Sequence, residues 1–97
     1  MAEAEFAAGL DCIRRAIITA LREFGVTLLP GEISHQPLTP GRVPDELSLS
    51  LAPKDAAFVT GTFTRDEIEA CVRGVERADV REKVGRIADK YSKRPPG

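Results

Sequence analysis

The first quarter of the chain carries an apolar stripe with the period of an α-helix. Large apolar side chains recur there at steps of three and four residues: Phe6, Leu10, Ile13, Ile17, Leu21 and Phe24. At about 100° per residue they share one face of a helix. Gly25 follows directly, and glycine commonly ends a helix because it adopts left-handed backbone angles at little cost. The sequence predicts an amphipathic helix over residues 2–24, which needs an apolar surface to cover it.

A second apolar pattern, with a period of two residues, predicts the surface that covers this helix. The stretch "ELSLSLA" places three leucines on one face of a strand and Glu46, Ser48 and Ser50 on the other. This alternation predicts a half-buried β-strand. "PKDA" is a plausible turn, and the β-branched and aromatic residues of "AFVTGTF" favour a returning strand. The buried face of that second strand stays open, since Val59 and Phe63 share one side and Phe58 and the threonines the other.

Two strands alone are marginally stable in water. The hairpin therefore needs helices against one face, a third strand from "VTLL" at residues 26–29, or a second copy of the chain paired edge to edge. The last option makes a homodimer an alternative worth testing.

A long loop is expected over residues 26–45, which hold four of the seven prolines. The pairs Pro30-Gly31 and Pro40-Gly41 each suit a type II turn, since proline presets one central residue and glycine supplies the positive φ of the next. A connection this long without an apolar pattern is unusual, so we expect a mobile loop.

The remainder of the chain predicts two helices. Thr64 stands three residues before Glu67, the spacing of a capping box. The apolar stripe that begins at Ile68 and the one that begins at Val80 would be turned by about 120° in a continuous helix. We therefore expect a break near residues 76–79, with Asp79 and Glu82 forming a second cap, and a flexible tail over residues 93–97. With 97 residues in all, the prediction is one small α+β domain over residues 1–97.

The sequence offers little chemistry. His35 lies in the proline-rich loop, where we expect a solvated side chain. Cys71 sits on an apolar stripe and is expected in the core, whereas Cys12 lies beside the first stripe and is expected to be exposed or at a contact. One bridge between the two cysteines is the alternative. Because no phosphate-binding loop, HExxH or calcium loop occurs, the prediction is a protein without enzymatic activity, cofactor or metal.

Composition bears on location. No apolar run approaches the roughly 18 residues of a membrane span, and the first residues, "MAEAEF", are acidic where a signal peptide is basic. These features predict a soluble cytoplasmic protein without membrane contact. Arginine outnumbers lysine ten to four, which points to a GC-rich, bacterial genome.

The net charge is only −1, yet "REKVGRIADKYSKR" holds six basic and two acidic residues. Glu82 with Arg86 and Asp89 with Lys93 have the spacing of helix-stabilising ion pairs. After these pairs, three cations remain as candidate contacts for an anion or a partner: Lys83, Lys90 and Arg94.

The final helices resemble a DNA-binding helix-turn-helix only weakly, because Glu69, Arg73 and Lys83 fall where its interior is apolar. The expected function is thus a non-enzymatic protein-interaction or regulatory module, with nucleic-acid association through the basic flank as the alternative. Nothing in the sequence identifies the partner.

Overall fold

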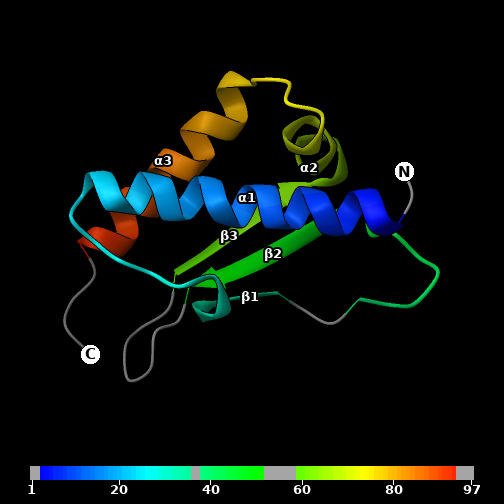
Figure 1. The fold of residues 1–97 in the computed structure, drawn as a ribbon, viewed down its shortest axis with the longest axis horizontal. Coiled ribbons are helices and arrows are strands. Elements are labelled where there is room, and N and C mark those ends of the chain that lie inside the picture. The colour runs from blue at the N-terminus through cyan, green and yellow to red at the C-terminus, as the bar shows by residue number, and fades with distance from the viewer. Residues whose placement is uncertain (1–2, 36–37, 52–58, 94–97) are drawn as a thin grey trace.

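The structure, a computed structural model, describes residues 3–35, 38–51 and 59–93. Helices and strands follow in the order α1 (Glu3–Glu23), the 3-10 turn η1 (Pro30–Glu32), β1 (Ile33–His35), β2 (Glu46–Leu51), β3 (Val59–Thr64), α2 (Arg65–Val72) and α3 (Ala78–Ser92) (Figure 1). The predicted α+β class is confirmed.

The three strands form one antiparallel sheet in the order β1-β2-β3, and the helices gather on one of its faces (Figure 1). Leu47, Leu49 and Leu51 of β2 are buried beneath them, and so are Val59 and Phe63 of β3. This assigns the buried face of β3 that the sequence left open. The opposite face carries serine and threonine and is left to solvent, as an antiparallel sheet allows.

The N-terminal helix forms as predicted, and its stripe from Phe6 to Leu21 is buried. Phe24 differs: it follows the last helical residue and is 48% exposed. Gly25 has a φ of 74° and donates its N–H to the Arg22 carbonyl, while Val26 donates to the Leu21 carbonyl. These two bonds form a Schellman motif, which satisfies the last carbonyls of the helix.

The third strand lies elsewhere than expected. It forms at Ile33–His35, so of the alternatives for the hairpin the helices against one face are present and a strand at "VTLL" is not, although Leu28 is buried in the core. His35 consequently lies in a strand and not in a loop. Pro40-Gly41 makes the predicted turn, since Gly41 has a φ of 76° and Arg42 donates to the Thr39 carbonyl. Pro30-Gly31 does not, because these residues begin the 3-10 turn.

Arg65, at the start of α2, holds the end of the segment that connects β1 to β2. Its guanidinium donates to the carbonyl oxygens of Val43 and Pro44 at 2.9 and 3.2 Å. The segment expected to be a mobile loop is therefore attached to the sheet at β1 and to α2 at its other end.

The break between the last two helices falls at residues 73–77, slightly before the predicted place. The Thr64–Glu67 capping box is confirmed in both of its hydrogen bonds. The second cap is wrong: Arg77 is the N-cap residue of α3, and Asp79 lies within the first turn. The predicted turn at residues 53–56, Phe58 and Arg94 lie outside the described residues.

Candidate functional site

A close contact between α1 and α2 sets the geometry of the helical layer. A Cβ atom at Gly9 would lie 2.7 Å from the carbonyl oxygen of Ile68, so only glycine permits this approach. The N-terminal half of α1 is thereby packed directly on α2. Past this contact α2 ends, and no other helix of the described residues lies between the second half of α1 and the start of α3.

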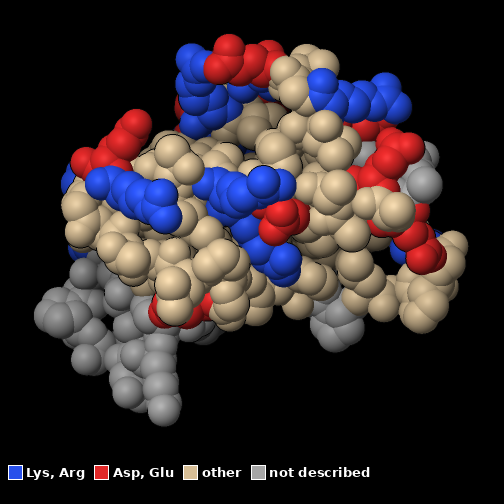
Figure 2. Space-filling view, in the orientation of Figure 1, with Lys and Arg blue, Asp and Glu red and all other residues tan. Residues whose placement is uncertain are grey.

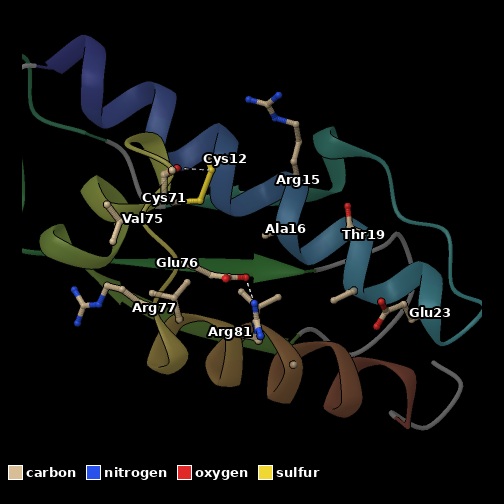
Figure 3. A pocket seen from close by; sticks show the side chains of 15 residues that line it. Cys12, Arg15, Ala16, Thr19, Glu23, Cys71, Val75, Glu76, Arg77 and Arg81 are labelled. Atoms are coloured by element: carbon tan, nitrogen blue, oxygen red, sulfur yellow. Dashed lines mark hydrogen bonds and ion pairs between the residues drawn. A yellow bond between two sulfur atoms is a disulfide. The ribbon is translucent and has the colours of Figure 1, made fainter.

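That space is a groove of about 820 Å³ (Figure 3). Its sides come from α1, the 73–77 connection and the first half of α3. Small apolar residues line its length: Ala16, Ala20, Val80, Val84 and Gly85. In Figure 2 uncharged atoms occupy the recess between the charged side chains of α1 and those near the α2–α3 connection. The groove is therefore apolar inside and charged at its margins.

A disulfide between Cys12 and Cys71 closes one end of the groove (Figure 3). The expectation of a core thiol at Cys71 is thus wrong, whereas Cys12 lies at a contact, which was one of its two expected places, and the bridge named as the alternative is present. Its position follows from packing, because each cysteine lies three residues after a partner in the Gly9–Ile68 contact. Both cysteines are half-buried, so the bond borders the open groove.

The margins of the groove carry both signs of charge. Arg15 pairs with Asp11 at 2.8 Å, and Arg81 pairs with Glu76; both arginine side chains are 71% exposed. At the connection, the hydrogen bond from Arg77 to Asp79 raises the pKa of Arg77 and lowers that of Asp79. The pairs are local, so their charges remain accessible to a partner.

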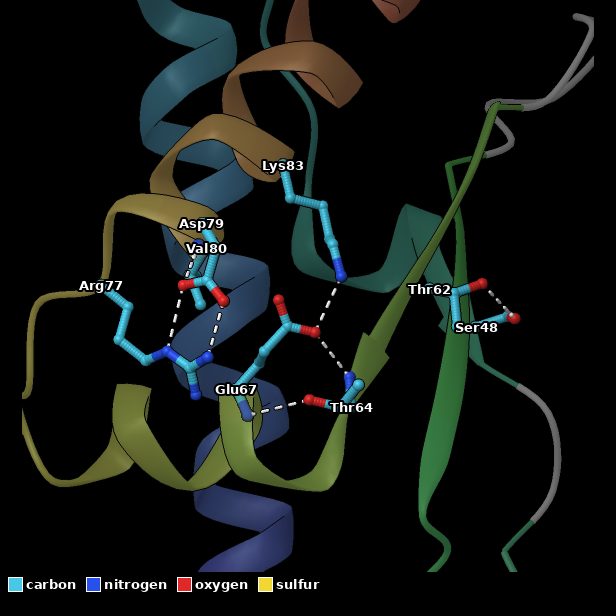
Figure 4. A network of polar contacts seen from close by, with 8 residues as sticks. All are labelled: Ser48, Thr62, Thr64, Glu67, Arg77, Asp79, Val80 and Lys83. Carbon is cyan, nitrogen blue, oxygen red and sulfur yellow. Dashed lines mark hydrogen bonds and ion pairs between the residues drawn. The ribbon is translucent and has the colours of Figure 1, made fainter.

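The three candidate contact cations do not form one surface. Lys83 lies 2.7 Å from a carboxylate oxygen of Glu67 (Figure 4). It also lies 5.2 Å from the centroid of the Phe63 ring. Lys90 is exposed on α3, and Arg94 lies outside the described residues. The structure thus gives Lys83 a protein partner that the sequence could not show.

Glu67 is the partner in question, and it is only 4% exposed. Burial alone would raise its pKa, but hydrogen bonds from Lys83 and from the Thr64 backbone N–H outweigh this and lower the pKa. Glu67 therefore remains ionised and joins the start of α2 to α3.

The helical ion pairs predicted on α3 are confirmed. Arg86 lies 2.6 Å from Glu82, and Lys93 lies 3.0 Å from Asp89. On the face shown in Figure 2, basic and acidic side chains are interspersed, without a broad basic area.

The groove contains the disulfide but no histidine, since His35 lies in β1 and outside its lining. Among the described residues, no three histidine, cysteine or acidic side chains gather as a metal site would require. Nor does any helix in the described ranges have the length and apolarity to span a membrane.

Sequence reasoning missed the groove because its lining consists of ordinary small residues. The signal that was available is the pair Ala16 and Ala20, one turn apart beside the buried stripe of α1. Gly85, which leaves a gap on the surface of α3, is a second such signal. None of the protein-family models, curated proteins or solved structures compared with this chain matches it.

Proposed function

We propose that this protein acts by binding, as a protein-interaction module without enzymatic activity of its own, and that it holds an amphipathic helical segment of a partner between α1 and α3. The observation that carries the proposal is the apolar groove, which the chain's own described side chains leave unfilled. An amphipathic helix that lays its apolar face into such a groove is a recurring mode of peptide recognition.

The spacing of the lining supports a helical occupant. Ala16 and Ala20 lie one helical turn apart on α1, and Val80 and Val84 do the same on α3. Anchor side chains at positions i, i+3 or i+4, and i+7 of a helix follow the same repeat. The small size of Ala16, Ala20 and Gly85 would allow the partner backbone to approach closely.

The charges at the margins favour a partner with acidic flanks. Arg15, Arg77 and Arg81 border the groove, against the acidic side chains of Glu23 and Glu76. Exposed ion pairs contribute little because water screens them, so the arginines can exchange their present partners for carboxylates of a bound helix at little cost.

Nucleic-acid association has less support. Of the basic flank of α3, Lys83 pairs with Glu67, Arg86 with Glu82 and Lys93 with Asp89. Phosphate binding at Lys83 would have to compete with the buried carboxylate of Glu67, whereas a helix in the groove would displace only exposed partners at its margins.

The cytoplasmic location stays a proposal, and the disulfide bears on it. Persistent disulfides are rare in the cytosol of mesophiles and common in oxidising compartments. If the protein works in a reducing cytoplasm, we expect the dithiol form of Cys12 and Cys71 there.

A peptide selection tests the groove. A phage-displayed library of amphipathic helices is selected on the purified protein, and the enriched peptides are measured by fluorescence anisotropy. We expect apolar anchors at helical spacing with aspartate or glutamate beside them. Ala16→Arg, which places a long cation in the groove, should weaken binding at least about tenfold. Ala8→Arg, a matched change at an exposed position of the same helix, should leave it unchanged.

Two results would contradict the proposal. One is the absence of any enriched helical peptide after repeated rounds of selection. The other is equal binding to wild type, Ala16→Arg and Ala8→Arg, which would place the contact outside the groove.

A further inference from the structure

The two edges of the sheet differ in how they are protected against pairing. β1 is only three residues long and follows directly on the Pro30–Glu32 turn. β3 has six residues, none of them charged and none a proline. Natural proteins usually protect an edge strand with charges, proline, a bulge or short length. The β3 edge has neither a charge nor a proline, and its length is ordinary for a strand.

Two hydrogen bonds at the end of β3 show which backbone groups point away from β2 along this edge. Arg65 donates its N–H to the Asp45 carbonyl at 2.8 Å, so it faces β2, and Thr64 donates outward to Glu67 at 2.8 Å. Backbone groups alternate along an antiparallel strand, so the N–H and C=O groups of Thr60 and Thr62 also face outward. Because β3 is the last strand of the sheet and pairs with β2 alone, no strand among the described residues pairs with these four groups.

Figure 4 shows which elements lie on either side of β3. The helices lie on one side of β3, and the Ser48–Thr62 hydroxyl pair lies on the other. Lys83 and Glu67 meet near Thr64, at the end where the chain enters α2. The edge of β3 from Thr60 to Thr62 therefore runs between the helical face and the outer face of the sheet. The Lys83–Glu67 ion pair lies just beyond it, near Thr64.

We propose that β3 pairs with β3 of a second copy of this chain, antiparallel, with the two-fold axis at Gly61, to form a continuous six-stranded sheet. Thr60 then lies opposite Thr62 of the second copy, and the outward groups of both residues form four backbone hydrogen bonds across the axis. Gly61 lies opposite its own copy in the non-hydrogen-bonded position, where the backbones approach most closely and the lack of a side chain is an advantage.

The register is restricted by the rest of the fold. Apolar residues must stay on the helical face of both sheets, which excludes registers shifted by one residue. Moving the axis to Thr62 would require the N–H of Thr64, which the Glu67 carboxylate already accepts. With the axis at Gly61, Val59 meets Phe63 on the inner face, and Thr60 meets Thr62 on the outer face. Cross-strand pairs of these types are favourable.

Sedimentation velocity on the full chain tests this pairing from micromolar to millimolar concentration. We expect the mass to rise from one chain to two only toward the higher concentrations, because a short edge contact is a weak interface.

Thr60→Pro removes an outward N–H and leaves the β2 ladder intact, so it should raise the dissociation constant at least about tenfold. Thr60→Val, which keeps the N–H, should pair as wild type. Thr60→Lys is a second edge-blocking variant, at an exposed position, and circular dichroism verifies the fold of each.

Amide hydrogen exchange gives a readout without substitution. With rising concentration, the amides of Thr60 and Thr62 should gain protection, while that of Thr64 should not change. The proposal is overturned if the chain stays monomeric at millimolar concentration. It is equally overturned if folded Thr60→Pro or Thr60→Lys dimerises as wild type does, or if protection appears elsewhere. Groove binding is measured separately with Ala16→Arg, so failure of one proposal leaves the other standing.

Discussion

Glu67 connects three parts of the chain through one carboxylate. It accepts a hydrogen bond from the Thr64 N–H, which caps α2 where the chain leaves β3, and another from Lys83 of α3. The sequence predicts the first bond, because a capping box is a local pattern. It could not predict the second, because residues 67 and 83 meet only after α2 and α3 have packed.

Removing Lys83 should therefore cost stability. Lys83→Gln removes the positive charge beside a buried carboxylate, and we expect the free energy of unfolding to fall by about 1–2 kcal/mol. Lys90→Gln removes an exposed charge of the same helix and should change it by less than about 0.5 kcal/mol. Urea denaturation of both variants measures the difference, and equal stabilities would show that the Lys83–Glu67 pair contributes nothing.

The same carboxylate makes stability depend on pH. Because the folded state lowers the pKa of Glu67, its contribution is complete above the pKa of an unfolded glutamate, about 4.3, and is lost as pH falls through the folded value. Denaturation midpoints at pH 7 and at successively lower pH should show this loss in wild type. Glu67→Gln should lack that part of it, while the control Glu5→Gln should retain it. An identical acid profile for wild type and Glu67→Gln would contradict the assignment.

At the scale of elements, the contact between α1 and α2 positions both the disulfide and the groove. A Cβ atom at Gly9 would meet the Ile68 backbone, which cannot move as a side-chain end can. Gly85 is also helical, on α3, but a Cβ atom there would have no neighbour within 4 Å. Gly9 is therefore required by the packing of α1 on α2. Gly85 meets no such requirement and only lowers the helix propensity of α3.

Alanine at these two positions should have opposite effects. Gly9→Ala forces α1 and α2 apart and should destabilise the protein by about 1–3 kcal/mol. Gly85→Ala should stabilise it by about 0.5–1 kcal/mol, because alanine favours the helix. Thermal unfolding gives the sign directly, and a stabilising Gly9→Ala would mean that α1 and α2 do not approach this closely.

The elements that were predictable are those with a periodic pattern of their own. The stripe from Phe6 to Leu21 and the alternation of "ELSLSL" gave α1 and β2 almost to the residue. β1 was missed because it has three residues, too few for a period, and it becomes a strand only by pairing with β2. The groove was missed for a related reason. It lies between α1, the 73–77 connection and α3, so no single element carries a sequence pattern for it.

At the scale of the whole molecule, the disulfide joins positions 59 residues apart, between the first helix and the first helix after the sheet. Constraining a loop of this length in the unfolded chain is worth up to about 4 kcal/mol in the chain-entropy model. The bond also holds the end of α2, which continues into the connection that lines the groove.

Reduction should therefore lower stability without changing the fold. With a thiol reductant we expect the free energy of unfolding to fall by about 2–4 kcal/mol. The doubly substituted variant with Cys12→Ser and Cys71→Ser should unfold at about the midpoint of the reduced wild type and should not respond to the reductant. A denaturation midpoint unaffected by reduction would argue against a disulfide in the folded protein.

The most direct measurement of the central claim is a titration of the ¹⁵N-labelled protein with a selected helical peptide, followed through amide chemical shifts. The account predicts the largest changes along the groove at Ala16, Ala20, Val80, Val84 and Gly85. It predicts little change on the outer face of the sheet, at Ser34 and Ser50. Changes confined to that face, or to the basic flank around Lys90, would contradict it.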